Sequence, residues 1–349
     1  MTVCVPTPLN KTREPDLAYL LAATREIAKH LRPGQLIVLE STTYPGTTTE
    51  VALPELEHGG LRAGEDFHLV FSPERIDPGN ERYQVHNTPK IVGGLTPACT
   101  EAGTALYRAA VETVVPVSSP TAAEMAKLLE NTFRAINIGL VNEMAIIANK
   151  LGLDIWEVVS AAATKPFGFM PFYPGPGLGG HCIPIDPHYL SWKLRTLNYR
   201  TRFIELADDI NGSMPTYVVE RVGTALNEDR KPIRDSKILI LGVAYKRDID
   251  DWRESPAIPV IEGLINRGGD VSYHDRYVPH IALGHHGEGH RLSSVELDYP
   301  RLADYDCVVI ITDHRYFDAA AIVDHAHRVV DTRNLTGPLG REQDKVVKL

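Results

Sequence analysis

The alternation of short apolar runs with helical patterns most constrains how this chain can fold. In the first part of the chain, strands are predicted at 2–5, 36–40, 68–71, 91–92 and 113–117. Helical patterns lie between them, at 17–31, after Thr47 and at 97–110. A strand followed by a helix and another strand is typical of a parallel, doubly wound sheet. The alternation returns near the C-terminus, with strands predicted at 237–241, 271–274, 307–312 and 328–331 and a helix at 257–266.

A long helical pattern lies between the two alternating segments. Apolar residues recur every three or four positions from Met125 to Ile147, and Thr121 and Glu124 have capping-box spacing. We predict one helix from Thr121 to about Lys150, with a linking or dimer-forming role. Further helices are predicted at 155–163, 187–197, 203–211 and 215–226.

These patterns predict an α/β protein of two doubly wound, Rossmann-like domains joined by a long central helix and an α-helical middle region. The polar stretch at 227–235 marks a boundary. The predicted domains are 1–118, a nucleotide-binding sheet; 119–228, the helical region; and 229–349, a smaller doubly wound sheet.

Composition excludes several classes of protein. The 349 residues are 43% hydrophobic, and the net charge of -9 is spread without a basic stripe, which argues against a nucleic-acid partner. No apolar run approaches the roughly 18 residues of a membrane span, so no membrane partner is expected. Four cysteines without paired spacing indicate a reducing compartment, and we expect a cytoplasmic protein. The histidine-rich segment 280–290 lacks acidic or cysteine partners at ligand spacing, so we expect a flexible surface loop and no metal.

One loop of the helical region presents a cysteine. The sequence Tyr-Pro-Gly-Pro-Gly-Leu-Gly-Gly-His-Cys-Ile-Pro-Ile-Asp runs from Tyr173 to Asp186. Its glycines permit positive φ and remove side chains where a ligand or another segment comes close, and its prolines restrict the loop to a defined shape. We predict that Cys182 is a nucleophile; the alternative is a loop cysteine of no chemical consequence.

Polar residues follow several predicted strands. Ligands of doubly wound sheets lie beyond the carboxyl ends of the strands. Ser41 and Thr42 follow the strand at 36–40, and Glu74 and Arg75 follow the strand at 68–71. These side chains are candidates for a site, although turns, helix caps and solvated loops use the same residue types.

Two further groups of residues are candidates. On the long helix, Lys127 and Asn131 are one turn apart, so both side chains can reach the same point. The alternative is a solvent-exposed helix face with a lysine of no functional role. Lys246, Arg247 and Arg253 follow the first strand of the second sheet and suit phosphates or a uridine-like ligand; the alternative is a solvated basic turn.

In this order the motifs resemble the UDP-glucose/GDP-mannose dehydrogenase family, the NAD-dependent nucleotide-sugar 6-dehydrogenases. The resemblance covers nearly the whole chain, and six motifs in order are highly specific. They are Cys-Val-Pro-Thr-Pro at 4–8, Glu-Ser-Thr-Thr-Tyr-Pro-Gly-Thr at 40–47, Phe-Ser-Pro-Glu-Arg at 71–75, Ala-Lys-Leu-Leu-Glu-Asn at 126–131, Gly-Gly-His-Cys-Ile-Pro-Ile-Asp at 179–186, and Ala-Tyr-Lys at 244–246 with Trp-Arg-Glu-Ser at 252–255. The segment 164–177 is most similar to the UDP-N-acetylglucosamine branch.

The resemblance implies a four-electron oxidation of the C6 alcohol of a UDP-sugar to a carboxylate, with NAD used twice. It implies that the Cys182 thiolate adds to an aldehyde, and that the resulting thiohemiacetal becomes a thioester. Asp186, with Glu74 and Thr42, would assist the water that cleaves the thioester, while Lys127 and Asn131 would hold the developing alkoxide. Acidic sugars of surface polysaccharides are the implied products.

The resemblance also implies binding residues and partners. The cofactor-binding residues would be Thr7, Pro8, Ser41, Thr42 and Arg253. The substrate-binding residues would be Glu74, Arg75, Lys127, Asn131, Tyr173, Gly177, Gly179 and Lys246. The expected partners are the UDP-sugar and further copies of the chain, as a homodimer or higher homo-oligomer.

The sequence departs from the family pattern at its front. The family's first strand, its Gly-x-Gly-x-x-Gly turn and the acidic residue for the adenosine ribose are not found, so we expect a first domain without its N-terminal βαβ units, roughly 60 to 90 residues. A rival hypothesis is a truncated, non-catalytic module that binds a UDP-sugar and dimerises. A UDP-glucose 6-dehydrogenase is another alternative. A thiol hydrolase or transferase without NAD is disfavoured, because His181 is the only histidine near Cys182 in sequence.

Overall fold

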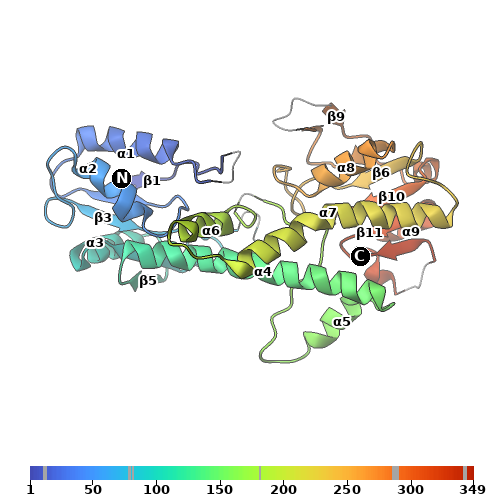
Figure 1. The fold of residues 1–349 in the computed structure, drawn as a ribbon, viewed down its shortest axis with the longest axis horizontal. Coiled ribbons are helices and arrows are strands. Elements are labelled where there is room, and N and C mark those ends of the chain that lie inside the picture. The colour runs from blue at the N-terminus through green and yellow to red at the C-terminus, as the bar shows by residue number, and fades with distance from the viewer. Residues whose placement is uncertain (11–13, 78–79, 81, 181, 285–290, 341–343) are drawn as a thin grey trace. The chain divides into compact units, whose positions relative to one another are not determined.

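The computed structural model describes residues 1–10, 14–77, 80, 82–180, 182–284, 291–340 and 344–349. The chain forms two compact units, which are described separately (Figure 1). The first unit comprises Met1–Arg134 and Ile185–Ile204, and the second comprises Ala135–Pro184 and Glu205–Leu349.

The first unit is built on a five-stranded sheet of order β1-β2-β3-β4-β5. Its strands are β1 (Thr2–Val3), β2 (Leu36–Leu39), β3 (His68–Phe71), β4 (Lys90–Gly94) and β5 (Val114–Val117). All neighbouring pairs are parallel except β3 and β4, which are antiparallel. Parallel strands need a crossover, usually a helix, and the described part of the β3–β4 connection contains none. The sheet therefore departs from an all-parallel arrangement at this pair.

Helices cover both faces of this sheet (Figure 1). The helices α1 (Ala18–His30) and α2 (Leu53–Glu57), preceded by the short π-helix η1 (Thr48–Ala52), pack on one face. The helix α3 (Pro97–Arg108) packs on the other. Side chains alternate along a strand, so Ile37 joins the first layer and Val38 the second. The predicted doubly wound layout is confirmed here.

The helix α4 (Pro120–Lys150) confirms the predicted long helix, but its N-terminal cap differs. Its first turn is capped by Ser119 Oγ, which accepts a hydrogen bond from the Ala122 amide, so the predicted capping box is wrong. Much of the predicted apolar stripe is exposed: Leu129 is 59% and Leu140 is 55% exposed. This chain alone therefore leaves much of that face uncovered.

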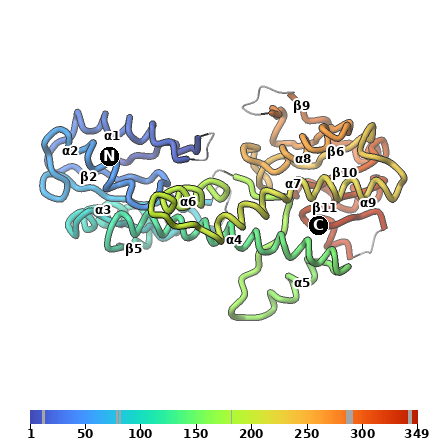
Figure 2. Tube along the Cα trace, viewed as in Figure 1, coloured from blue at the N-terminus to red at the C-terminus, as the bar shows by residue number. Residues whose placement is uncertain are grey.

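The helices that follow are α5 (Ile155–Ala162), α6 (Asp186–Thr196) and α7 (Arg202–Glu228). Two helices were predicted where α7 runs without a break, and Figure 2 traces it as one element. Pro215 lies inside it. Proline has no N–H for the carbonyl of Asn211, four residues earlier, so α7 continues past this position without that hydrogen bond.

The second unit contains a five-stranded sheet of order β12-β11-β10-β6-β7 with all neighbours parallel. Its strands are β6 (Lys237–Leu241), β7 (Asp270–His274), β10 (Cys307–Ile310), β11 (Val329–Asp331) and β12 (Val346–Lys348). The helix α8 (Ala257–Asn266) packs on one face, while α9 (Ala319–His325) and the 3-10 helix η3 (Pro300–Asp304) pack on the other. The second doubly wound sheet is confirmed.

Three strands of the second unit were not predicted. They are β12 and the antiparallel pair β8 (His280–Ala282) and β9 (Arg291–Ser293). The predicted histidine-rich loop begins inside β8, where His280 Nδ1 is 3.1 Å from Ser293 Oγ. His285, His286 and His290 lie outside the described residues. Within the part of the chain that the structure describes, no helix has the length and apolar composition needed to cross a membrane.

Candidate active site

A buried carboxylate on α6 meets the polar face of α4 in the first unit. Asn131 Nδ2 donates a hydrogen bond of 2.5 Å to Asp186 Oδ2. Lys127, Asn131 and Asp186 are only 8%, 5% and 3% exposed. Residues 127 and 131 are one helical turn apart, so both reach the same side of α4. An ammonium group, an amide donor and a carboxyl group thus share one desolvated place.

The environment of Asp186 tunes its proton affinity. Burial raises the pKa of Asp186 to about 6, while the Lys127 charge and the Asn131 hydrogen bond act in the opposite direction. A carboxyl group with a pKa in this range gains and loses a proton near neutral pH. That behaviour suits a general acid or base.

Glu124 of α4 forms hydrogen bonds with the threonine-rich segment that follows β2 and leads into η1. It is 1% exposed, and its two oxygens accept hydrogen bonds from the Gly46 amide (2.5 Å), the Thr48 amide (2.8 Å) and Thr48 Oγ1 (2.6 Å). The carboxylate thereby satisfies amides at the start of η1 that no helical partner can reach. Because Lys127 lies one turn further along α4, the same helix fixes both the loop and the buried lysine.

The hydroxyl groups at the strand ends hold two loops together. Thr7 Oγ1 donates to the Thr42 carbonyl at 2.7 Å. Ser41 Oγ accepts from the Val5 amide and donates to the Val5 carbonyl, both at 2.8 Å. The loops after β1 and β2 therefore bring Thr7, Ser41 and Thr42 to one edge of the sheet, as expected for the carboxyl ends of parallel strands.

This edge fits part of a dinucleotide site. A dinucleotide lies beyond the carboxyl ends of such strands, where Thr7, Pro8, Ser41 and Thr42 are found. The turns that the structure describes after β1, β2 and β3 contain no Gly-x-Gly-x-x-Gly sequence, the turn whose amides hold a pyrophosphate. The residues present therefore fit the strand-end contacts of NAD and leave the pyrophosphate without such a turn.

Glu74 and Arg75, adjacent in sequence, have different partners. Glu74 Oε1 accepts from the amides of Arg75 and Ile76, both at 2.7 Å, and Glu74 Oε2 is 3.4 Å from Lys90 Nζ. Arg75 pairs with Glu130 of α4 at 2.7 Å. Burial opposes ionisation of Glu74, but the Lys90 charge and the two amides outweigh it and lower the pKa. Glu74, with its side chain 52% exposed, is an accessible carboxylate, whereas Arg75 ties its loop to α4.

In the second unit, the glycine loop before Cys182 packs against helices and the second sheet. The Gly175 amide donates to Asn142 Oδ1 of α4 at 2.9 Å. Gly177 has a φ of +137°, and a Cβ there would be 3.3 Å from the carbonyl of Asn211, which Pro215 leaves without its usual helical donor. Gly180 has a φ of +93°, and a Cβ there would be 2.9 Å from the Tyr245 ring. Glycine is required at both positions by conformation and by close approach.

Three predicted residues of the second unit lie at or near its surface. Cys182 is exposed at the end of the glycine loop. Tyr173, at the start of that loop, stacks on Trp156 with ring centroids 5.9 Å apart. Arg253 is held by Asp251, with Nη2 and Oδ2 2.9 Å apart.

Sequence reasoning missed one cation at the glycine loop, Arg333. It follows β11, its Nε donates to the Ile311 carbonyl at 3.0 Å, and its Nη1 is 2.5 Å from where a Cβ on Gly175 would stand. Burial lowers the pKa of this guanidinium, which the nearby Asp313 opposes. Its position just after a predicted strand was a usable signal, because the same reasoning had selected Lys246 after β6.

An internal carboxylate binds the amides that follow β6. Asp275 follows β7 and is 1% exposed, and its Oδ2 accepts from the amides of Val243 (2.8 Å) and Ala244 (3.0 Å). It also accepts from His314 Nε2 at 2.9 Å, since Nδ1 of that ring accepts from the Asp248 amide. In dinucleotide-binding sheets the corresponding turn amides face a pyrophosphate, and an acid after the second strand faces a ribose. Here these groups bind each other.

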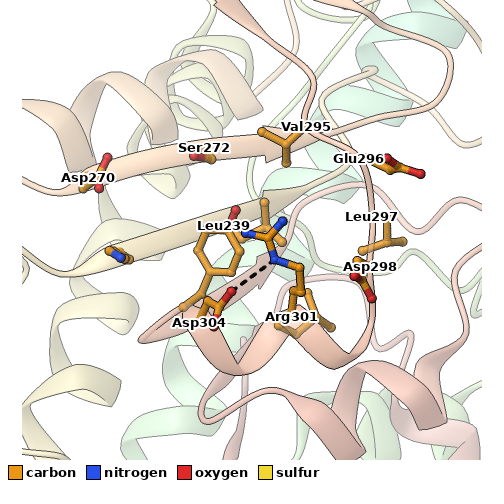
Figure 3. Close-up of a pocket in the computed structure, with 12 residues that line it drawn as sticks. Leu239, Asp270, Ser272, Val295, Glu296, Leu297, Asp298, Arg301 and Asp304 are labelled. Atoms are coloured by element: carbon orange, nitrogen blue, oxygen red, sulfur yellow. Dashed lines mark hydrogen bonds and ion pairs between the residues drawn. The ribbon is translucent and has the colours of Figure 1, made fainter.

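A cavity of about 610 Å³ lies at the opposite edge of the second sheet (Figure 3). Its lining includes Asp270 at the start of β7 and an ion pair of Arg301 Nε with Asp304 Oδ2 at 3.2 Å. Ligands of such sheets lie beyond the other ends of the strands, and both members of this pair are well exposed. We assign this cavity no role. Among the residues that the structure describes, no group of three or more metal-ligating side chains is arranged to hold a metal ion.

The structure brings two groups of predicted residues together within the first unit. They are Lys127, Asn131 and Asp186 between α4 and α6, and Thr7, Ser41 and Thr42 at the sheet edge. The predicted residues of the second unit are Cys182, Tyr173, Gly177, Gly179, Lys246 and Arg253. His181 lies outside the described residues. The catalytic and binding roles of all these residues stay predictions.

Comparison with known proteins assigns the chain to a family. Models of the UDP-glucose/GDP-mannose dehydrogenase family match over most of its length: the NAD binding domain at 1–111, the central domain at 121–213 and the UDP binding domain at 239–338. A UDP-N-acetyl-D-glucosamine 6-dehydrogenase of Pseudomonas aeruginosa is 36% identical over 317 residues, 90% of this chain and 74% of that protein. A UDP-N-acetyl-D-mannosamine dehydrogenase of Methanocaldococcus jannaschii is 33% identical over 95% of this chain and 74% of that protein.

Solved structures give the same assignment. The UDP-D-ManNAc dehydrogenase of Pyrococcus horikoshii superposes with a TM-score of 0.87 at 32% identity, over 99% of this chain and 80% of that one. The NDP-N-acetyl-D-galactosaminuronic acid dehydrogenase of Methanosarcina mazei gives 0.84 at 29% identity, over 100% and 76%. The predicted enzyme class, an NAD-dependent UDP-sugar dehydrogenase, is confirmed, and the chain belongs to the UDP-glucose/GDP-mannose dehydrogenase family.

Proposed function

We propose that the substrate is UDP-N-acetylglucosamine and that its C6 alcohol is oxidised to the carboxylate through a covalent intermediate on Cys182. Similarity to the Pseudomonas aeruginosa UDP-N-acetyl-D-glucosamine 6-dehydrogenase supports the choice of sugar. The observation that carries the chemistry is the desolvated group of Lys127, Asn131 and Asp186, whose carboxyl pKa of about 6 suits proton transfer near neutral pH.

In this proposal the donors on α4 hold the substrate oxygen. The Lys127 ammonium and the Asn131 amide stabilise the alkoxide that develops as the C6 hydroxyl loses its proton. NAD, when bound at the strand ends near Thr7 and Ser41, supplies the acceptor for each hydride. The Cys182 thiolate then adds to the aldehyde carbon, and the same two donors hold the thiohemiacetal oxygen.

Hydrolysis of the thioester completes the proposed reaction. Asp186 takes the proton from the attacking water, the carbon–sulfur bond breaks, and the Cys182 thiolate leaves with the bonding pair. Glu74 and Thr42 complete the proton and water network. Thus Asp186, whose pKa is raised, is the proposed base, and Glu74, whose pKa is lowered, is its accessory.

The second unit supplies the remaining proposed contacts. Lys246 and Arg333 hold the diphosphate as cations, and Arg333 lies beside Gly175 of the glycine loop. Gly177 and Gly179 of the same loop contact the substrate in this proposal. Tyr173 contacts the substrate, and Arg253 contacts the cofactor. We also propose a homodimer through the exposed apolar face of α4, which includes Leu129, Phe133, Leu140 and Met144. Sedimentation equilibrium measures that oligomeric state.

The test combines NADH formation with an independent binding measurement. The chain is supplied with NAD and, separately, the UDP forms of N-acetylglucosamine, N-acetylmannosamine, N-acetylgalactosamine and glucose, and binding of each is followed by calorimetry. We expect two NADH per sugar with the N-acetylglucosamine form. Cys182→Ser is expected to keep sugar binding and to abolish acid formation, because a serine hydroxyl has a much higher pKa than a thiol and is a far poorer nucleophile than a thiolate near neutral pH.

Cys4→Ser is the matched control, because it removes the other exposed thiol. Acid formation that persists unchanged in Cys182→Ser would refute the covalent mechanism. Preference for another sugar would correct the substrate. Sugar binding without any NADH would favour the rival hypothesis of a binding module.

A further inference from the structure

We propose that Lys90 is a positioning residue that holds the carboxylate of Glu74 in one orientation at the carboxyl edge of the first sheet. The proposal rests on the proposed function, in which Glu74 belongs to the proton and water network. It concerns a side chain that sequence analysis did not select.

The antiparallel direction of β4 brings Lys90 to this edge. The register pairs Val70 with Gly94 and Phe71 with Gly93, so paired residue numbers add to 164. Continuing this register three residues past the pair of Phe71 and Gly93 places Lys90 opposite Glu74. A strand parallel to β3 would instead begin at the opposite edge of the sheet. The antiparallel direction of β4 thus places the Lys90 cation at the sheet edge where the candidate site residues lie.

The contacts of Lys90 are those of a bridge between two carboxylates. Its side chain is 10% exposed, and its Nζ is 2.9 Å from Glu40 Oε2 and 3.4 Å from Glu74 Oε2. The ammonium lies 5.1 Å from the centroid of the Tyr107 ring, and the Tyr107 hydroxyl donates to Glu40 Oε1. Glu40 is therefore held on both oxygens, and the buried end of the bridge is fixed.

The charges around Glu74 make Lys90 the cation that balances this edge. The other titratable groups near Lys90 and Glu74 are Glu40 after β2, Tyr107 of α3 and Cys4 after β1. Burial, and then the charge of Glu40, raises the pKa of the Cys4 thiol. Arg75, in the same loop, is paired with Glu130. Two carboxylates thus share one ammonium. Without the Lys90 ammonium, Glu74 faces the charge of Glu40 and keeps the backbone donors of Arg75 and Ile76. Its carboxylate is then freed to rotate and takes up a proton at higher pH.

Lys193 provides a matched control in the same unit. Its side chain is 19% exposed, its Nζ pairs with Glu50 at 2.6 Å, and it lies 5.1 Å from the centroid of the Tyr44 ring. Lys193→Met therefore removes the same kind of ion pair and ring contact as Lys90→Met, but at a place that does not contact Glu74.

The experiment measures the pKa of Glu74 directly. Carboxyl resonances of ¹³C-glutamate-labelled protein are titrated in the wild type, Lys90→Met, Lys90→Arg and Lys193→Met, with Glu74→Gln to assign the signal. We expect the Glu74 pKa to rise by about 1 unit or more in Lys90→Met and to stay near the wild-type value in the other two lysine variants. In parallel, the rate of acid formation is measured at pH 8, where Asp186 is ionised in every variant, and it is expected to fall several-fold in Lys90→Met and to recover in Lys90→Arg.

A double variant guards against misfolding. Lys90→Met leaves Glu40 buried without its cation, so Lys90→Met combined with Glu40→Gln removes that charge while still leaving Glu74 without its partner. An unchanged Glu74 pKa in both the single and the double variant would overturn the proposal. A raised Glu74 pKa with an unchanged rate of acid formation at pH 8 would support the positioning role of Lys90 and refute the proposed role of Glu74 in the reaction.

Discussion

Replacing Asp186 with asparagine should stabilise the first unit at neutral pH while removing the proposed base. The folded pKa of about 6 lies roughly 2 units above the ordinary aspartate value of about 3.9, and each unit corresponds to about 1.36 kcal/mol. Ionised Asp186 therefore destabilises the folded state by roughly 3 kcal/mol relative to its protonated form. The side-chain amide of the variant carries no charge, and the Asn131 amide can rotate to donate to it or accept from it.

The pH dependence gives the sign of the effect. Because the folded pKa is raised, the folded state binds more protons than the unfolded state between about pH 4 and pH 6. The contribution of Asp186 to stability is fully present below pH 4 and is lost as pH rises through 6. The stability of Asp186→Asn relative to the wild type should therefore increase by roughly 3 kcal/mol from pH 4 to pH 8.

Urea unfolding at several pH values measures this difference. Trp192 lies on α6 in the first unit, so a background with Trp156→Phe and Trp252→Phe makes fluorescence report on that unit. Glu65→Gln, which neutralises an exposed carboxylate of the same unit, is the control and should show no such pH-dependent gain. A free-energy difference between Asp186→Asn and the wild type that stays constant from pH 4 to pH 8 would refute the reasoning.

Two further predictions concern the loops that surround the site. Glu124→Ala should lower the free energy of unfolding by roughly 2 to 4 kcal/mol in the same fluorescence assay, because the buried donors of Gly46 and Thr48 lose their acceptor; a loss below about 0.5 kcal/mol would contradict this. Gly180→Ala should weaken UDP-sugar binding at least several-fold in calorimetry, since a Cβ meets the Tyr245 ring and φ is +93°. Gly212→Ala, with open space around its Cβ, should bind normally, and equal affinities of the two variants would sink the argument.

Much of the fold could be predicted from the sequence because buried parallel strands are continuous apolar runs. The bounds of β6 and α8 agree with the prediction to the residue, since a run of branched aliphatic residues and a helix ending at Arg267-Gly268-Gly269 leave little choice. The strands β8, β9 and β12 were missed because each has three residues and none has a fully buried pattern. Short strands at sheet edges carry little signal in a single sequence.

The direction of β4 and the course of α7 could not be predicted for a different reason. Strand direction depends on the connection that precedes the strand, and sequence patterns do not encode it locally. Two helices were predicted on either side of 212–214, but the contacts of α7 with the rest of the second unit outweigh the one hydrogen bond lost at Pro215. In both cases tertiary structure decided between local alternatives.

The candidate site was only partly accessible to sequence reasoning. The spacing of Lys127 and Asn131 predicted that they share a point in space, and the structure has both beside Asp186. The link to Asp186 came from family resemblance alone, because α6 meets α4 through long-range packing. Lys90 and Arg333 were missed, since their relevance depends on strand direction and on the path of the glycine loop.

The carboxylate of Asp275 has a consequence for how the second sheet should be used as a scaffold. The Asp275 carboxylate is part of the chain, so it competes for the Val243 and Ala244 amides at an effective concentration far above that of any free phosphate. Grafting a dinucleotide site onto this sheet would first require removing Asp275, and Val243 and Ala244 would then need a new acceptor for their amides. The second sheet has the strand arrangement of a nucleotide-binding domain, yet the Asp275 side chain occupies the amides that would bind a pyrophosphate.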